Sequence, residues 1–190
     1  METQIQTLRD ILSVFPVDAK AIFHLAIGDI SVGLADTLCD DVPEYFDQYA
    51  DLVIYMHELI MEGKKASNRQ LAQAEDMLVE QIKFLSTLSG ENAVFIDVLM
   101  SSVSVAIDVI ADWKSQGILG NMKDESDFIS QSVDLREMVL QRSAEQVCKN
   151  ARNAGAAEEE IEEIRDYILT LCETEEDVWE YDEDIEEEEE

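Results

Sequence analysis

The chain has 190 residues, 46% of them hydrophobic, so it can bury a core of domain size and cannot be disordered throughout. Its 44 acidic residues against 13 basic ones give a net charge of −31 at pH 7. That charge repels DNA, RNA and anionic lipid, and it favours partners with basic surfaces.

Two prolines and seven glycines punctuate a chain of predicted helices. The first helix is expected over 3–14 and the second over 18–39, separated by Pro16. Apolar side chains recur at helical spacing in the second: Ile22, Phe23, Ile27, Ile30 and Leu34.

Pro43 suits the first turn of a third helix, which runs to Glu62. Its apolar stripe is Phe46, Tyr49, Val53, Met56 and Ile60. Ser67 can cap a fourth helix that ends before Gly90. The stripe of this helix is Leu71, Ala74, Leu78, Ile82 and Leu85.

The fifth segment, about 91–116, is apolar on nearly every side, so we expect 93–111 to form the central helix of a bundle. Valines and isoleucines alternate here with serines, which also fits a strand, but the length favours a helix. Asp97 and Asp108 make a membrane span costly.

A sixth helix is predicted near 125–153 and a seventh over 157–173. The sixth has the weaker stripe: Val133, Leu140, Ala144, Val147 and Ala151. The seventh has a clear one: Ile161, Ile164, Ile168 and Leu171. We therefore predict an all-α bundle of about seven helices over 1–173, followed by an acidic, disordered tail over 174–190.

Acidic residues concentrate at the C-terminal end. Residues 158–190 hold 19 acids and one base, Arg165, and residues 1–157 keep a net charge of −13. From Glu173 onward, 13 of 18 residues are acidic. These charges recur about every 4.6 Å if the tail is extended and about every 2 Å if it is helical. The two values bracket the spacing of about 3.4 Å along a nucleic-acid strand.

Aromatic side chains within an acidic run suit a basic groove, where charge steers the encounter and rings anchor the complex. We therefore predict partner-binding residues on the seventh helix and the tail: Glu158, Glu159, Glu162, Glu163, Asp166, Glu175, Glu176, Asp177, Trp179, Glu180, Tyr181, Asp182 and Asp184. Two alternatives stay open: the acids only maintain solubility, or Trp179 packs back onto the bundle.

Motifs for catalysis and metal binding are missing from the sequence. It has no phosphate-binding G-x-x-x-x-G-K-[ST], no G-x-S-x-G elbow, no Glu-x-x-His pair and no CxxC. We predict no catalytic residue, no cofactor and no metal ligand. If the protein is an enzyme, its first candidates are Asp97, Asp108, His24 and His57.

In composition and general build, the chain resembles two groups of small acidic helical proteins. One is the DNA-mimicking anti-restriction and anti-defence proteins, and the other is the immunity proteins that neutralise basic nuclease toxins. No motif aligns to either, so no residue is carried over.

The leading hypothesis is a non-enzymatic inhibitor or decoy that covers a basic, nucleic-acid-binding surface of a partner protein. It should lose affinity when 174–190 is removed. A chaperone-like adaptor that shields a basic client is the alternative, and an enzyme on a helical scaffold is the third. No signal peptide is visible, so we expect a cytoplasmic protein that binds neither nucleic acid nor membrane directly. A homo-oligomer remains open.

Overall fold

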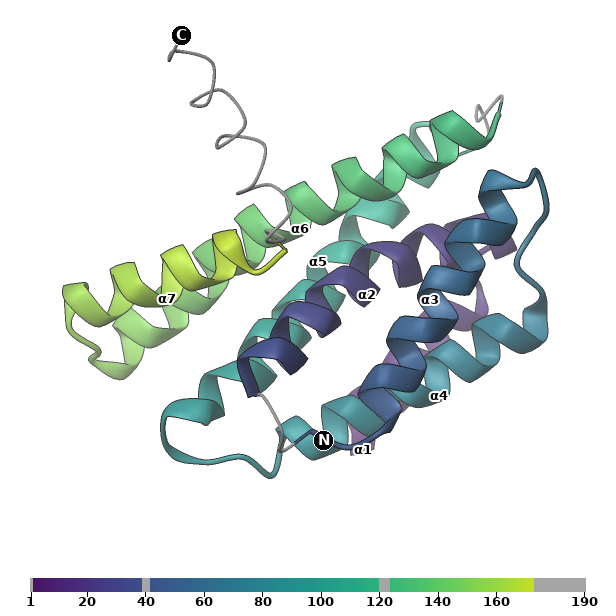
Figure 1. Ribbon diagram of the computed structural model, residues 1–190. Coiled ribbons are helices and arrows are strands. Elements are labelled where there is room, and N and C mark those ends of the chain that lie inside the picture. Colours follow the sequence, from purple (N-terminus) through teal and green to yellow (C-terminus); the bar gives the residue numbers. More distant parts are fainter. Residues whose placement is uncertain (1, 39–41, 120–123, 173–190) are drawn as a thin grey trace, which may run out of the picture.

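The computed structural model describes residues 2–38, 42–119 and 124–172, and the structural statements below concern these ranges. They contain seven α-helices and no strand (Figure 1), which confirms the predicted all-α bundle. The helices are α1 (Glu2–Ser13), α2 (Val17–Leu38), α3 (Tyr45–Met61), α4 (Asn68–Leu85), α5 (Val94–Ser115), α6 (Glu125–Ala154) and α7 (Glu158–Thr170).

The bundle is centred on α2 rather than on α5. Helix α2 packs against α3, α4, α5 and α6, whereas α5 packs against α2, α4 and α6. Both helices are long and apolar enough to cross a membrane, but 61% of the apolar window of α2 and 44% of that of α5 lie inside the bundle. The helix predicted over 91–116 is confirmed as α5. Asp97 and Asp108 are exposed, so one side of α5 faces solvent.

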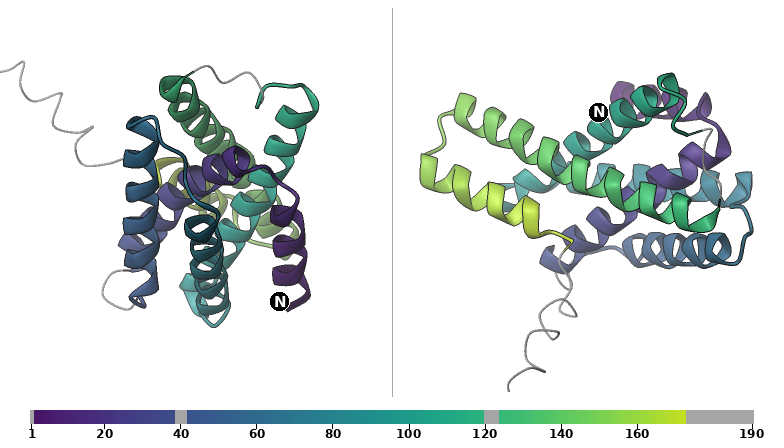
Figure 2. Two further views of the ribbon diagram at one scale, coloured as in Figure 1. Left: turned by 90° about the vertical axis from the view of Figure 1, so that its right-hand side faces the viewer. Right: turned by 90° about the horizontal axis from the view of Figure 1, so that it is seen from above.

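The apolar stripes of α3 and α4 are buried at every predicted position. The stripe predicted for α6 is partly wrong, because Val133 is 36% exposed and Leu135 and Val139 are buried in its place. The first half of α6 packs on the bundle, whereas its second half is also covered by α7 (Figure 2, right). The buried side of the helix therefore changes along its length, and a single stripe cannot describe it.

The start of α4 is fixed by a reciprocal cap. Gln70 N–H donates to Ser67 Oγ at 3.2 Å, and Ser67 N–H donates to Gln70 Oε1 at 2.8 Å. We expect Ser67→Ala to lower the free energy of unfolding by about 1 kcal/mol in urea denaturation, because two amide groups lose their partners. Ser89→Ala is the matched control, since Ser89 precedes a 3-10 turn without such a bond. An equal loss in both variants would contradict the capping role.

Candidate acidic interface

Helix α7 begins directly after a tight reversal of the chain. Gly155 adopts φ +92°, a left-handed conformation that glycine accepts readily, and it ends α6. The carboxylate of Glu160 then accepts the Ala157 N–H at 2.9 Å. Acidic side chains in a first turn are favoured by the helix dipole. These features place α7 antiparallel beside the C-terminal half of α6 (Figure 2, right).

The far end of α7 is held against α2. Ile161, Ile168 and Leu171 are buried. The carbonyl of Leu171 passes so close to Gly33 that a Cβ at this glycine would lie 2.1 Å from the oxygen. Tyr167 Oη also donates to Thr37 Oγ1 of α2 at 3.1 Å. The helix is therefore fixed on α6 at its start and on α2 at its end.

Four of the predicted partner-binding residues form one outward face of α7. Glu159, Glu162, Glu163 and Asp166 follow the i, i+3, i+4, i+7 pattern that places side chains on one side of a helix. All four are exposed, and within the described residues none of their carboxylates has a hydrogen bond or an ion pair. We call these four residues the acidic stripe. It is a rigid anionic surface.

Glu158 borders the acidic stripe at the seam between α6 and α7, where it lines the same hollow as Glu162. Arg152 donates to its two carboxylate oxygens from Nε at 2.8 Å and from Nη2 at 2.9 Å. This paired guanidinium lowers the pKa of Glu158. The sequence pattern did not predict the ion pair between Arg152 and Glu158. The short connection between α6 and α7 could have indicated it.

The predicted tail residues lie outside the described part of the chain: Glu175, Glu176, Asp177, Trp179, Glu180, Tyr181, Asp182 and Asp184. The last described residue, Cys172, is half-buried beside Asp29 and Arg136, and burial raises the pKa of its thiol to about 12. The described part of the chain therefore ends where α2, α6 and α7 meet.

The four candidates for an enzyme site are not brought together. Asp97, Asp108 and His57 are exposed on α5 and α3, whereas His24 is buried in α2. His24 Nδ1 shares a hydrogen bond of 2.9 Å with the hydroxyl of Tyr49. Burial, with a smaller effect of the nearby Lys20, lowers the pKa of His24 to about 3, so the ring is neutral at pH 7.

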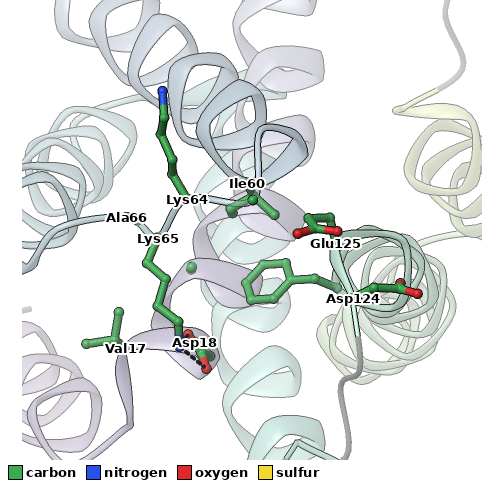
Figure 3. A pocket seen from close by; sticks show the side chains of 11 residues that line it. Val17, Asp18, Ile60, Lys64, Lys65, Ala66, Asp124 and Glu125 are labelled. Atoms are coloured by element: carbon green, nitrogen blue, oxygen red, sulfur yellow. Dashed lines mark hydrogen bonds and ion pairs between the residues drawn. The ribbon is translucent and has the colours of Figure 1, made fainter.

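A hollow of about 170 Å³ opens between the start of α2, the α3–α4 connection and the start of α6 (Figure 3). Apart from Glu125, its charged groups already have partners. Lys65 forms an ion pair with Asp18 at 3.2 Å, and Asp124 accepts the Asp127 N–H that caps α6 at 3.0 Å. Lys64 points away from the hollow. These contacts stabilise helix ends and leave no set of free polar groups converging on a ligand.

In the described ranges, no three His, Cys, Asp or Glu side chains gather as a metal site would require. The chain matches no protein-family model, and comparisons with curated proteins and with solved structures find no similar protein.

Proposed function

We propose that this protein is a non-enzymatic, cytoplasmic binding protein that covers a basic, nucleic-acid-binding surface of a partner protein, as an inhibitor or decoy of the DNA-mimic, anti-defence or immunity type. The observation that supports it best is the acidic stripe on α7, four exposed carboxylates without partners among the described residues. A stripe of this kind can attract cationic side chains without first breaking an internal bond.

The spacing of the acidic stripe also supports the proposal. At about 1.5 Å rise per residue, Glu159 and Asp166 are separated by about 10.5 Å along the helix axis. The successive steps along the axis are about 4.5, 1.5 and 4.5 Å, a mean of about 3.5 Å. This mean is close to the charge spacing of about 3.4 Å along one nucleic-acid strand. A surface evolved to hold phosphates could therefore hold this helix.

The acidic stripe contains the like-charge pairs Glu159–Glu163 and Glu162–Asp166 at i, i+4 spacing. Such pairs destabilise a helix by a few tenths of a kcal/mol each. We expect neutralising all four (E159Q, E162Q, E163Q and D166N) to raise thermal stability slightly. The same variant should bind the partner about tenfold or more weakly at low salt. Scanning calorimetry and titration of the partner measure the two effects.

The matched control neutralises four exposed acids that also lack partners in the described ranges but lie on other helices: Glu2, Asp97, Asp108 and Asp134. It removes the same charge and tests whether placement matters. If both variants lost the same affinity, net charge alone would explain the interaction. That result would contradict a specific binding surface on α7.

The partner is to be identified by unbiased capture at low salt from cell extract, with the full chain and with a chain lacking 174–190. We expect a basic protein that is released steeply as salt rises, because exposed charges are screened over about 10 Å at 0.1 M. Binding that ignores salt would contradict the proposal. Loss of the partner's nucleic-acid binding indicates an inhibitor, whereas preserved activity indicates an adaptor that shields a client.

A further inference from the structure

A second surface lies between α3 and α6, along the half of α6 that α7 does not cover (Figure 2, right). Here the two helices form the walls of a groove of about 310 Å³, with α2 as the floor. We call it the α3–α6 groove. Its lining residues are Leu25 and Asp29 from α2, Val53, Ile54 and His57 from α3, and Ile129, Ser132, Val133 and Arg136 from α6.

The two walls of the groove present aliphatic side chains to solvent. Ile54 is 57% exposed on the α3 wall, and Val133 is 36% exposed on the α6 wall. Single exposed apolar residues are ordinary, but two that face one hollow from opposite sides form a place where an apolar side chain would be buried.

Three exposed acidic residues, each one helical turn from Ile54 or Val133, flank the lining of the groove, and we call them its rim. On α3, Asp51 and Glu58 lie one turn before and one turn after Ile54, and on α6, Glu137 lies one turn after Val133. All three carboxylates are exposed and have no partner in the described residues. The one arginine of the lining, Arg136, is already bound to Asp29 at 2.8 Å. The charge left to an incoming ligand is therefore negative.

We propose that the α3–α6 groove binds a basic segment of a partner protein. An apolar side chain of that segment is buried between Ile54 and Val133, and its lysines or arginines lie against Asp51, Glu58 and Glu137. This inference rests on the proposed function in one respect, that the partner is basic. It adds an apolar contact between the two proteins, which the acidic stripe does not provide. Charge supplies attraction and orientation, and the aliphatic contact supplies most of the residence time.

The position of the groove fits one partner bound at both surfaces. Leu171, at the end of α7, contacts Gly33, which is one turn after Asp29 of the groove floor. The last described residues therefore lie next to the groove. The tail itself is a poor occupant, because its 13 acids in 18 residues would be repelled by the same acidic rim.

The test uses the full chain and a synthetic amphipathic peptide of leucine and lysine, with an oligolysine of equal charge as a second probe. Ile54→Asp adds a negative charge while removing the anchor. We expect Ile54→Asp to weaken binding of the leucine–lysine peptide about tenfold or more, and we expect the same of Val133→Asp. The control is Tyr55→Asp, which adds the same charge one residue away, at a 49% exposed position outside the groove, and should not weaken binding.

Titration calorimetry provides the affinities, and circular dichroism confirms that each variant keeps its helices. If the Ile54→Asp and Tyr55→Asp proteins bound the leucine–lysine peptide with equal affinity, the proposed binding site in the groove would be wrong. The proposal that acidic residues of this protein bind a basic partner would still stand. Failure of both probes to bind at low salt would contradict the proposed function as well.

Two further outcomes would assign the groove to another occupant and overturn the proposal. Replacing Val178, Trp179, Tyr181 and Ile185 by serine in the full chain would tighten peptide binding if the tail filled the groove. Dimerisation that Ile54→Asp abolishes in sedimentation would assign the groove to a second copy.

Discussion

Replacing Gly33 with alanine should loosen α7 and lower the free energy of unfolding by about 1–3 kcal/mol, the range typical of overpacking. The added Cβ would lie 2.1 Å from the carbonyl oxygen of Leu171, so either the backbone of α7 or that of α2 must move. The gain of about 1 kcal/mol in helix propensity from replacing a glycine offsets only part of this cost. Urea denaturation measures the loss, and faster amide exchange in α7 locates it.

Gly28 provides a comparison, because a Cβ there would clash with a side chain, whereas a Cβ at Gly33 would clash with backbone. A Cβ at Gly28 would meet the methyl groups of Val53 at 2.7 and 2.8 Å. We therefore expect Val53→Ala to rescue Gly28→Ala. Leu171→Ala should not rescue Gly33→Ala, because the carbonyl oxygen remains in place. Rescue in both pairs would show that α7 is not fixed at Gly33 as described.

The second large effect concerns pH. Burial lowers the pKa of His24 from 6.5 to about 3 in the folded chain. As the pH falls, His24 is therefore protonated in the unfolded chain before it is protonated in the folded chain. The contribution of neutral His24 to the free energy of unfolding is complete above pH 6.5 and is lost as the pH falls towards 3. The loss amounts to about 4–5 kcal/mol over that window. The other titrating groups, including the 44 acidic residues, also change charge there, so the effect must be measured as a difference between variants.

The double variant His24→Leu with Tyr49→Phe removes the proton site and its partner together. Relative to wild type, its free energy of unfolding should rise by several kcal/mol between pH 7 and pH 3.5, measured by urea denaturation at each pH. Tyr49→Phe alone should cost about 1–3 kcal/mol at pH 7, since it leaves a buried ring nitrogen without its partner, while keeping the pH dependence. Parallel pH profiles of wild type and the double variant would contradict the assignment to His24.

The existence and limits of most helices follow from local sequence. Pro16 and Ser67 mark a helix end and a helix start, and α3 and α4 bury the stripes expected from their spacing. These features depend on interactions within a few residues, such as caps, turns and helical periodicity. They can therefore be predicted without knowing what each helix packs against.

Positions that depend on the partner helix could not be predicted in this way. Val133 has the same local pattern as a core residue, yet it lies on the wall of a groove. Apolarity on every side suggested that α5 was central, but α2 has more neighbours. Glu158 and Glu159 are neighbouring exposed acids in the sequence, and only the fold pairs Glu158 with Arg152 and leaves Glu159 without a partner among the described residues.

By itself, the sequence determined the helical class, the helix boundaries and the strongly acidic character, because these are sums or short-range properties of the residues. The tertiary structure decided which helix is central, which four acids of α7 form one free surface, and that Ile54 and Val133 face each other across a groove. Those relations join residues far apart in the chain, and they depend on how the helices pack rather than on the preferences of any single segment.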